Sequence, residues 1–288
     1  MKVRLPLPLV LLILVGCSDP TPRDLDTLIQ EGQREVFTDP ETMGPYSGPV
    51  FRLSPDDSTR VVFRGTLKKG QFHGSFTDYQ PDGIQDSLGF YQEGEYRDGL
   101  REGPFTYFYP SGVKRGEGQY FKGEQEGLYT SWYENGQLRN KLSFSNGQQD
   151  GPFELYDENG QLREKGSFSN GERDGPFESY YENGQLEFKG TGSNGELDGP
   201  VESYYENGQL EGKGSFFNGK EDGPWESYHE NGQLFFKGSY SNGELDGPYE
   251  EYHENGQLEL KGTYSNGEQC GRWIVKGQTV TYPPCPNG

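Results

Sequence analysis

The most regular feature of the sequence is a short pattern of aromatic, polar and glycine positions that returns along most of the chain. In "FESYYENGQLEFKGTG", residues 177–192, two arms rich in β-forming residues flank an Asn-Gly pair. Asn-Gly supplies the two positive-φ residues of a tight type I′ turn, and the arms are as short as those of a hairpin. The pattern therefore predicts a β-hairpin.

The hairpin pattern recurs with a constant period of 24 residues, which is the sequence signature of a repeat architecture. Asn-Gly-Gln-Leu begins at Asn135, Asn159, Asn183, Asn207, Asn231 and Asn255, and a second Asn-Gly begins at Asn146, Asn170, Asn194, Asn218, Asn242 and Asn266. Seven regular units fill residues 104–271, and degenerate hairpin units fill residues 49–103. The predicted fold class is all-β: an elongated, single-layer antiparallel sheet of tandem 24-residue hairpins.

A two-residue turn at Asn183-Gly184 sets the cross-strand register of one unit. It predicts these pairs: Tyr181 with Leu186, Ser179 with Phe188, Glu178 with Lys189, and Phe177 with Gly190. Glu and Lys recur at the same two positions of the regular hairpins, and opposite charges stabilise a cross-strand pair. This recurrence supports the register independently of the turn.

The second turn, "SNGELD", is predicted to be a four-residue loop centred between Gly195 and Glu196. Lys189 then also faces Glu202 of the next unit, and Gly190 lies between two large side chains, so that rings cover neighbouring glycines. A regular aromatic row falls on the Glu/Lys face unless a bulge rotates it. We take this row as the candidate interaction surface: Trp132, Tyr156, Tyr180, Tyr204, Tyr228 and Tyr252.

The N-terminus resembles a bacterial lipoprotein signal peptide. Lys2 and Arg4 precede a short apolar run that ends in "LVGC", with Cys17 as the last residue. The resemblance implies removal of residues 1–16, lipidation of Cys17, and export to a bacterial membrane. Ser18 suggests the outer membrane, on its periplasmic or surface face, in a Gram-negative cell. An ordinary signal peptide with an unmodified cysteine is the alternative.

Residues 17–48 contain four prolines and only weak helical spacing, which is interrupted by Gly32. We predict a tether or spacer with one short helix.

The repeating unit "DGPFESYYENGQLEFKGTGSNGELDG" resembles the MORN repeat, in the bacterial variant that is also grouped with the YwqK-type antitoxin family. The resemblance covers about three quarters of the chain. It implies an antiparallel hairpin sheet that serves as a spacer or an interaction platform.

Charge narrows the class of partner. The chain has a formal net charge of −20 and only 30% hydrophobic residues. Binding to nucleic acid, or directly to anionic lipid, requires clustered Lys and Arg, so we expect no nucleic-acid partner and membrane contact through the lipid anchor only. We expect an interaction scaffold or spacer whose partner is an unidentified protein or glycan at the cell envelope. The alternative function is an antitoxin- or immunity-like protein that masks a basic effector.

No chemistry beyond binding is indicated. His229 and His253 hold the same place in successive hairpins, about 9.6 Å apart, which is too far to share one metal ion, and His73 stands alone. Residues 194–199 imitate half of a calcium loop, but the twelfth position is Tyr205 rather than Glu. No nucleophile or phosphate-loop motif is present. We expect no enzyme activity, no metal and no cofactor.

Two cysteines remain near the C-terminus. Cys270 lies at the end of the last regular unit and Cys285 in the tail, after a strand pair around residues 273–282. In an oxidising compartment a disulfide between them would hold residues 272–288 as a cap over the open sheet edge. Two free thiols are the alternative.

Overall fold

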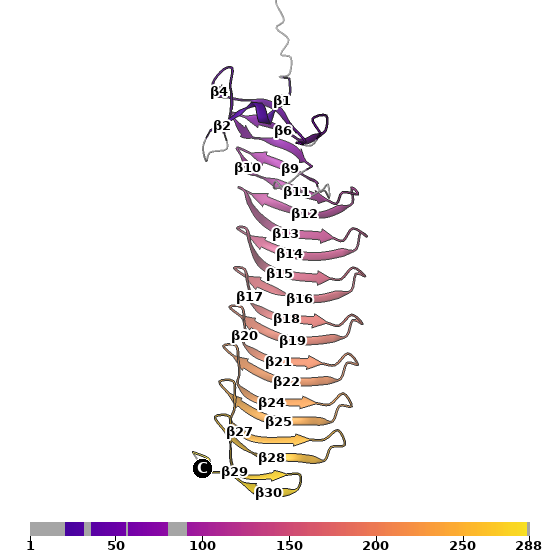
Figure 1. Ribbon diagram of the computed structural model, residues 1–288, viewed down its shortest axis with the longest axis vertical. Coiled ribbons are helices and arrows are strands. Elements are labelled where there is room, and N and C mark those ends of the chain that lie inside the picture. The colour runs from indigo at the N-terminus through magenta and orange to yellow at the C-terminus, as the bar shows by residue number, and fades with distance from the viewer. Residues whose placement is uncertain (1–20, 32–35, 56, 80–90, 287–288) are drawn as a thin grey trace, which may run out of the picture. The chain divides into compact units, whose positions relative to one another are not determined.

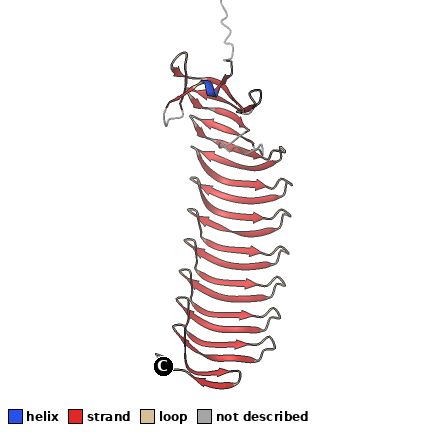
Figure 2. Ribbon diagram, in the orientation of Figure 1, coloured by secondary structure: helices blue, strands red, loops and turns tan. Residues whose placement is uncertain are grey.

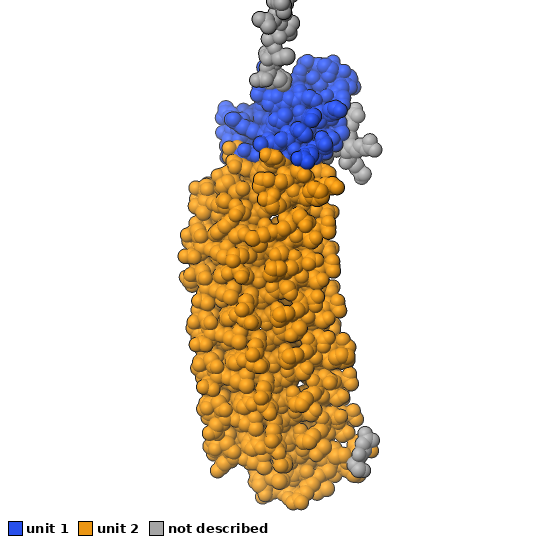
Figure 3. Space-filling view, turned by 180° about the vertical axis from the view of Figure 1, so that it is seen from behind, with its two compact units in different colours: residues 1–78, 96–99 blue, residues 79–95, 100–288 orange. Residues whose placement is uncertain are grey.

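The computed structural model describes residues 21–31, 36–55, 57–79 and 91–286. Nearly all of the regular structure is strand, with one short 3-10 helix among the described residues (Figure 2). None of those residues forms a helix with the length and hydropathy of a membrane span. The chain divides into two compact units, residues 1–78 with 96–99 and residues 79–95 with 100–288 (Figure 3).

The first unit contains strands of two sheets. β5 and β6 pair antiparallel, β6 continues to β7 and β8, β1 lies parallel to β5, and β2, β3 and β4 form a separate sheet. The elements are β1 (Arg23–Asp24), the 3-10 helix η1 (Leu25–Thr27), β2 (Ile29–Glu31), β3 (Val36–Asp39), β4 (Gly44–Pro45), β5 (Gly48–Leu53), β6 (Val61–Lys68), β7 (Gln71–Phe72) and β8 (Gly74–Asp78).

The expected spacer is corrected by the described part of residues 17–48. Leu25, Leu28, Phe37 and Tyr46 are each at most 8% exposed, so this segment packs into the first unit instead of extending from it. The Phe37 ring contacts Phe72 edge-on at 5.5 Å. These four residues are spaced irregularly and are buried, whereas Ile29 and Met43 of the same segment are exposed. An aromatic cluster from β6 to β8 offers the buried residues a surface.

The second unit is a stack of antiparallel strands in which each strand pairs with its neighbours in chain order (Figure 1). The strands are β9 (Tyr91–Arg97, whose last two residues belong to the first unit), β10 (Leu100–Arg101), β11 (Gly103–Phe108), β12 (Lys114–Phe121), β13 (Glu124–Trp132), β14 (Leu138–Ser145), β15 (Gln148–Tyr156), β16 (Leu162–Ser169), β17 (Glu172–Arg173), β18 (Gly175–Tyr180), β19 (Leu186–Ser193), β20 (Glu196–Leu197), β21 (Gly199–Tyr204), β22 (Leu210–Phe217), β23 (Lys220–Glu221), β24 (Gly223–Tyr228), β25 (Leu234–Ser241), β26 (Glu244–Leu245), β27 (Gly247–Tyr252), β28 (Leu258–Ser265), β29 (Glu268–Val275) and β30 (Gln278–Thr281). The predicted all-β hairpin array is confirmed for this unit.

The Asn-Gly-Gln-Leu turns follow a different geometry from the one predicted. Only Gly184 has a positive φ, of 85°, and the Tyr181 N–H donates to the Gln185 carbonyl, which closes a three-residue loop. Leu186 therefore pairs with Tyr180 and not with Tyr181, and a bulge between this pair and the pair of Ser179 with Phe188 restores the predicted register. The other predicted pairs of this unit are confirmed. A three-residue loop with glycine in the left-handed region matches the strand twist as well as a type I′ turn does.

The type I′ turn occurs instead at the second Asn-Gly pair. Asn194 and Gly195 have φ values of 51° and 82°, and Ser193 pairs directly with Glu196, so the predicted four-residue loop is wrong. The observed turn is two residues shorter than the predicted loop. The two residues left over lie further along the strand, before the pair of Lys189 with Glu202, where Gly199 has a φ of 109°. Lys189 still pairs with Glu202, as expected, because the irregularity lies between the turn and this pair.

Glycines in the sheet interior make room for aromatic rings of the following repeat. A Cβ on Gly214 would lie 1.8 Å from a ring carbon of Trp225, and one on Gly262 would lie 2.1 Å from Trp273. Trp273 itself is fully buried. These glycines do not need positive φ; they are required because the rings lie flat on the backbone.

The rings that lie on glycines form a column of aromatic residues along one face of the sheet. This column has one gap, which a neighbouring ring fills. Gly192 stands where neighbouring units have Phe or Tyr, and Val201 follows where they have an aromatic residue. Phe188 compensates, because its ring stacks on Phe177 at 5.5 Å and lies over Gly190. Val201 is 4% exposed, so the gap leaves no open site there.

The close packing at Gly214 gives a direct test. Gly214→Ala is expected to lower the free energy of unfolding by about 1–3 kcal/mol, because its methyl group overlaps the Trp225 ring. Gly212→Ala is the matched control, since its methyl group would meet no atom closer than 3.3 Å. Thermal and urea unfolding measure both variants; equal losses would contradict the proposed ring-on-glycine contact.

Candidate interaction surface

The aromatic row predicted from the sequence lies on one face of the second unit, together with the Glu and Lys positions. Trp132, Tyr156, Tyr180, Tyr204, Tyr228 and Tyr252 are all half-buried. Each tyrosine hydroxyl donates to the glutamate two residues before it, for example Tyr156 to Glu154 at 2.7 Å and Tyr228 to Glu226 at 2.6 Å. The bulge at each tyrosine leaves it on the Glu/Lys face.

The ion pairs of this face mostly join different repeats. Lys189 faces both Glu178 and Glu202 in the register, but its Nζ lies 2.8 Å from Glu202 of the following repeat. Four other lysines form the same ion pair with the following repeat, at 2.8–2.9 Å: Lys141 with Glu154, Lys165 with Glu178, Lys213 with Glu226 and Lys237 with Glu250. The register places Glu and Lys opposite each other within each hairpin, as expected, but most of the ion pairs join neighbouring hairpins.

The one exception is at the C-terminal end of the row. Glu250 accepts from Lys237 of the preceding repeat and from Lys261 of its own, each at 2.8 Å, and also from the Tyr252 hydroxyl. Its side chain is 15% exposed. These three donors lower the pKa of Glu250 to about 2, with Lys237 contributing most.

The network also explains the charge state of the row. The pKa of Glu178 is lowered by the hydrogen bonds from Tyr180 and Lys165. Burial, followed by the bond to Glu178, raises the pKa of the Tyr180 hydroxyl. Lys165 lies 5.7 Å above the Tyr180 ring, within the range of a cation–π contact. Each tyrosine is thus a neutral donor held between a carboxylate and an ammonium group.

The second residue of each aromatic pair joins the array together. The Tyr181 hydroxyl donates to the Tyr204 carbonyl at 2.7 Å, 23 residues later, and Tyr205 does the same to Tyr228 at 2.8 Å. His229 takes over this position and places Nε2 3.0 Å from the Tyr252 carbonyl. His229 is therefore a structural substitute for tyrosine in this column.

The Asn-Gly-Gln-Leu turns stack on one another along one edge of the second unit, which we call the first edge (Figure 1). The Asn183 side chain accepts from the Gln185 N–H within its own turn and donates to the Glu206 carbonyl of the next turn, at 2.8 and 2.9 Å. Gln161 lies against Gly184 of the next turn. Sequence reasoning assigned these residues to turn formation alone; their constant 24-residue spacing was the signal that they also contact neighbouring repeats.

The first edge also carries an exposed column of glutamates. One glutamate precedes each Asn-Gly pair: Glu134, Glu158, Glu182, Glu206, Glu230 and Glu254. Among the described residues, Glu182 alone of the six forms an ion pair, with Arg163 at 3.9 Å. The opposite edge, which carries the second Asn-Gly turns, is called the second edge.

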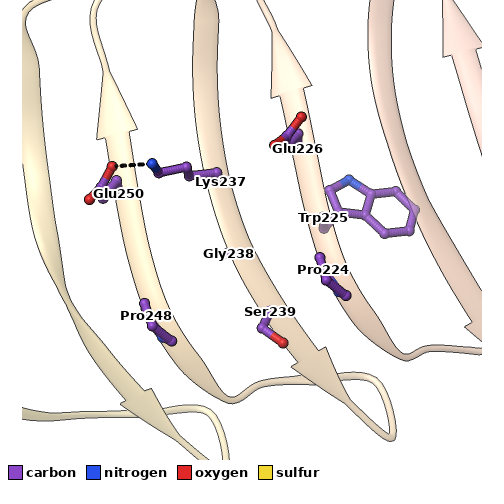
Figure 4. Close-up of a pocket in the computed structure, with 8 residues that line it drawn as sticks. All are labelled: Pro224, Trp225, Glu226, Lys237, Gly238, Ser239, Pro248 and Glu250. Carbon is purple, nitrogen blue, oxygen red and sulfur yellow. Dashed lines mark ion pairs between the residues drawn. The ribbon is translucent and has the colours of Figure 1, made fainter.

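A shallow depression of about 300 Å³ lies between two repeats on the Glu/Lys face. Pro224, Ser239 and Pro248 line one end, and Glu226, Lys237 and Glu250 the other (Figure 4). Lys237 is paired with Glu250 inside the depression, and Glu226 is paired with Lys213 outside it. It is open to solvent and has the shape of a contact surface rather than of an enclosed ligand site.

The C-terminal strand pair ends at a disulfide between Cys270 and Cys285, whose Cα atoms are 5.0 Å apart. Cys270 is 5% exposed, and Gly271 exchanges backbone hydrogen bonds with Pro283 and Tyr282. The tail is thereby tied to the last hairpin.

Cys17 lies outside the described residues. Among the residues that the structure describes, no group of three His, Cys, Asp or Glu side chains is placed to hold a metal ion. Asn194 of the calcium-like spacing forms the type I′ turn. His253 contacts Glu259 at 3.2 Å and His73 contacts Asp98 at 3.6 Å.

Comparison with known families agrees with this geometry. A family model described as a MORN repeat variant matches seven consecutive segments: residues 101–122, 125–146, 149–170, 173–194, 197–218, 221–242 and 245–266. The chain belongs to the MORN repeat variant family. Each matched segment covers nearly all of the two strands of one hairpin and the turn that joins them, so the MORN unit and the structural hairpin share one period.

Other comparisons add little. No curated protein matches the chain. Among solved structures, the chain is similar to "Crystal Structure of TcdB2-TccC3" and "Crystal Structure of TcdB2-TccC3-Cdc42", each at 12% identity, with TM-scores of 0.20 and 0.19. Each match covers 78% of this chain but only 17% of the other. At these scores neither bears on the MORN array or its function.

The bonds around Glu250 predict a pH dependence of stability. Because its pKa falls from an unfolded value of about 4.3 to about 2, Glu250 stabilises the fold fully above about pH 5 and progressively less as the pH falls toward 2. Glu250→Gln should therefore be less stable than the wild type at pH 7, by on the order of 1 kcal/mol, and nearly equal to it near pH 2. Urea unfolding at several pH values measures this difference.

Glu244→Gln, at an exposed position on the second edge, is the control. A Glu250→Gln deficit that stays constant from pH 7 to pH 2 would rule out the ionic origin of the effect.

Proposed function

We propose that the protein is a non-enzymatic, lipid-anchored repeat protein of the bacterial cell envelope that acts as an interaction scaffold. The observation that carries this proposal is the sameness of its repeats. Tyr180, Tyr204 and Tyr228 hold equivalent positions and make the same bond to the preceding glutamate. An active site needs several different groups at one place, whereas identical groups at regular intervals suit multivalent contact.

The proposed anchor follows from the lipoprotein-like signal with Cys17. A single acylated cysteine with two attached lipid groups would hold the chain at a membrane without a spanning segment. The acidic character of the chain, with a net charge of −20, would keep the repeats away from anionic headgroups. Contact with the membrane would then be limited to the lipid.

The acidic surface also favours a second candidate function, in which the protein masks a basic effector in the manner of an immunity protein. The exposed glutamates of the first edge are the observation behind it. The two functions differ in their partner: a scaffold binds an envelope protein and leaves its activity intact, whereas an immunity protein inhibits a toxic one.

A pull-down tests the scaffold. The mature chain, used as bait on detergent-solubilised envelopes, should retain a specific protein at moderate salt. Cys17→Ser should move the chain from the membrane to the soluble fraction without changing what it retains in detergent. If the bait retains no protein at low and moderate salt, the scaffold function is overturned and a passive spacer is favoured. A retained protein whose toxicity the chain suppresses would favour the immunity function.

A further inference from the structure

The face that bears the tyrosine row ends in a continuous strip along the first edge. In each repeat, the aromatic residue of the row pairs directly across the hairpin with the leucine of Asn-Gly-Gln-Leu: Trp132 with Leu138, Tyr156 with Leu162, Tyr180 with Leu186, Tyr204 with Leu210, Tyr228 with Leu234, and Tyr252 with Leu258. These residues are half-buried, with Leu258 36% exposed. They form six apolar shelves, one in each of six successive repeats.

Each shelf borders one carboxylate. Glu206, for example, lies two residues after Tyr204 in the exposed turn that leads to Leu210. The backbone carbonyl of Glu206 is held by Asn183 of the preceding turn, which fixes the turn at a constant place relative to the shelf. We call the six shelves with their six glutamates the first-edge strip.

The period of the strip restricts what can bind along it. Each repeat contributes two strands about 4.8 Å apart, so equivalent groups recur every ~9.6 Å. A polyproline II helix has three residues per turn and a rise of about 3.1 Å, so its side chains recur on one face every ~9.3 Å. An added β-strand would repeat its side chains about every 6.6 Å and would match the shelves poorly.

The negative charge of the strip favours a partner with basic side chains. The glutamates of the strip are exposed, and the chain as a whole is strongly acidic. In each turn of a bound polyproline II segment, one basic side chain would therefore meet a carboxylate. The other two residues of that turn would lie on the shelf formed by the aromatic residue and the leucine. Proline packs well against aromatic rings and enters the complex already ordered, so little conformational entropy is lost.

We propose that the first-edge strip binds a basic, proline-rich segment of a partner protein in the polyproline II conformation, with one turn of the segment per repeat. This deepens the scaffold function and rests on it. The partner is recognised by spacing and charge together, and longer segments bind more tightly because they occupy more repeats.

Fluorescence anisotropy tests the inference on the mature, lipidated chain in detergent. The probe is a labelled peptide of six Pro-Pro-Lys triplets, and a peptide of six Gly-Ser-Lys triplets has the same charge without the preformed helix. The Pro-Pro-Lys peptide should bind at least about tenfold more tightly. Equal affinities would show charge attraction alone and would overturn the proposal.

Matched variants locate the site. Replacing Glu206, Glu230 and Glu254 with Gln removes three carboxylates from the strip and should weaken Pro-Pro-Lys binding about tenfold. Replacing Glu196, Glu244 and Glu268 with Gln removes the same charge from the second edge and should leave the affinity within about twofold. These positions are all exposed, so both triple variants keep the fold, as circular dichroism verifies.

Equal losses in the two variants would overturn the strip as the site. Retention of a glycan strand by the strip in place of either peptide would overturn the protein segment as the occupant, and so would self-association of the chain that the first-edge variant abolishes. If the envelope pull-down retains a partner whose binding ignores the first-edge variant, this inference fails while the scaffold function stands.

Discussion

The structure of the second unit depends on one close contact, in which an aromatic side chain of one repeat lies flat on a glycine of the repeat before it. Trp225 covers Gly214 and Trp273 covers Gly262, at distances that leave no space for a Cβ. The described repeats have no helix or second sheet to bury their apolar groups. A ring on bare backbone removes apolar area from water within a single layer, and the Trp225 and Trp273 rings do so across the boundary between repeats.

The polar contacts follow the same direction. Lysines bond the glutamate of the next repeat, the second tyrosine of each pair bonds a carbonyl 23 residues later, and Asn183 bonds the next turn. Individually these half-exposed bonds contribute little. Repeated at each step, they fix the register of neighbouring hairpins, and the array becomes a one-dimensional chain of similar interfaces. The same register gives a polymeric partner equivalent contacts at equal intervals, which is the physical basis of the proposed scaffold.

Periodicity made the fold and most of the register predictable from the sequence. The pairs of Glu178 with Lys189 and of Phe177 with Gly190 follow from counting residues, because a strand places successive side chains on opposite faces. The type I′ turn was assigned to the wrong Asn-Gly pair, since Asn-Gly suits both a type I′ turn and the end of a three-residue loop, and only the φ of Asn183 or Asn194 separates them. The packing of residues 21–31 and 36–48 was missed because buried residues such as Leu25 and Phe37 follow no period. The register alone could not predict that Lys189 bonds the glutamate of the next repeat, because it places Lys189 opposite two glutamates.

Deletion of repeats tests most directly whether contacts between repeats carry the fold. Removing residues 199–222 takes out one full period and joins Asp198 to Gly223, so that each remaining ring still meets a glycine. Removing residues 199–210 takes out half a period and joins Asp198 to Glu211. The full-period variant should unfold cooperatively, with a small loss of stability, whereas the half-period variant should lose cooperative unfolding. Equal stability of the two variants in urea, by circular dichroism, would contradict the account.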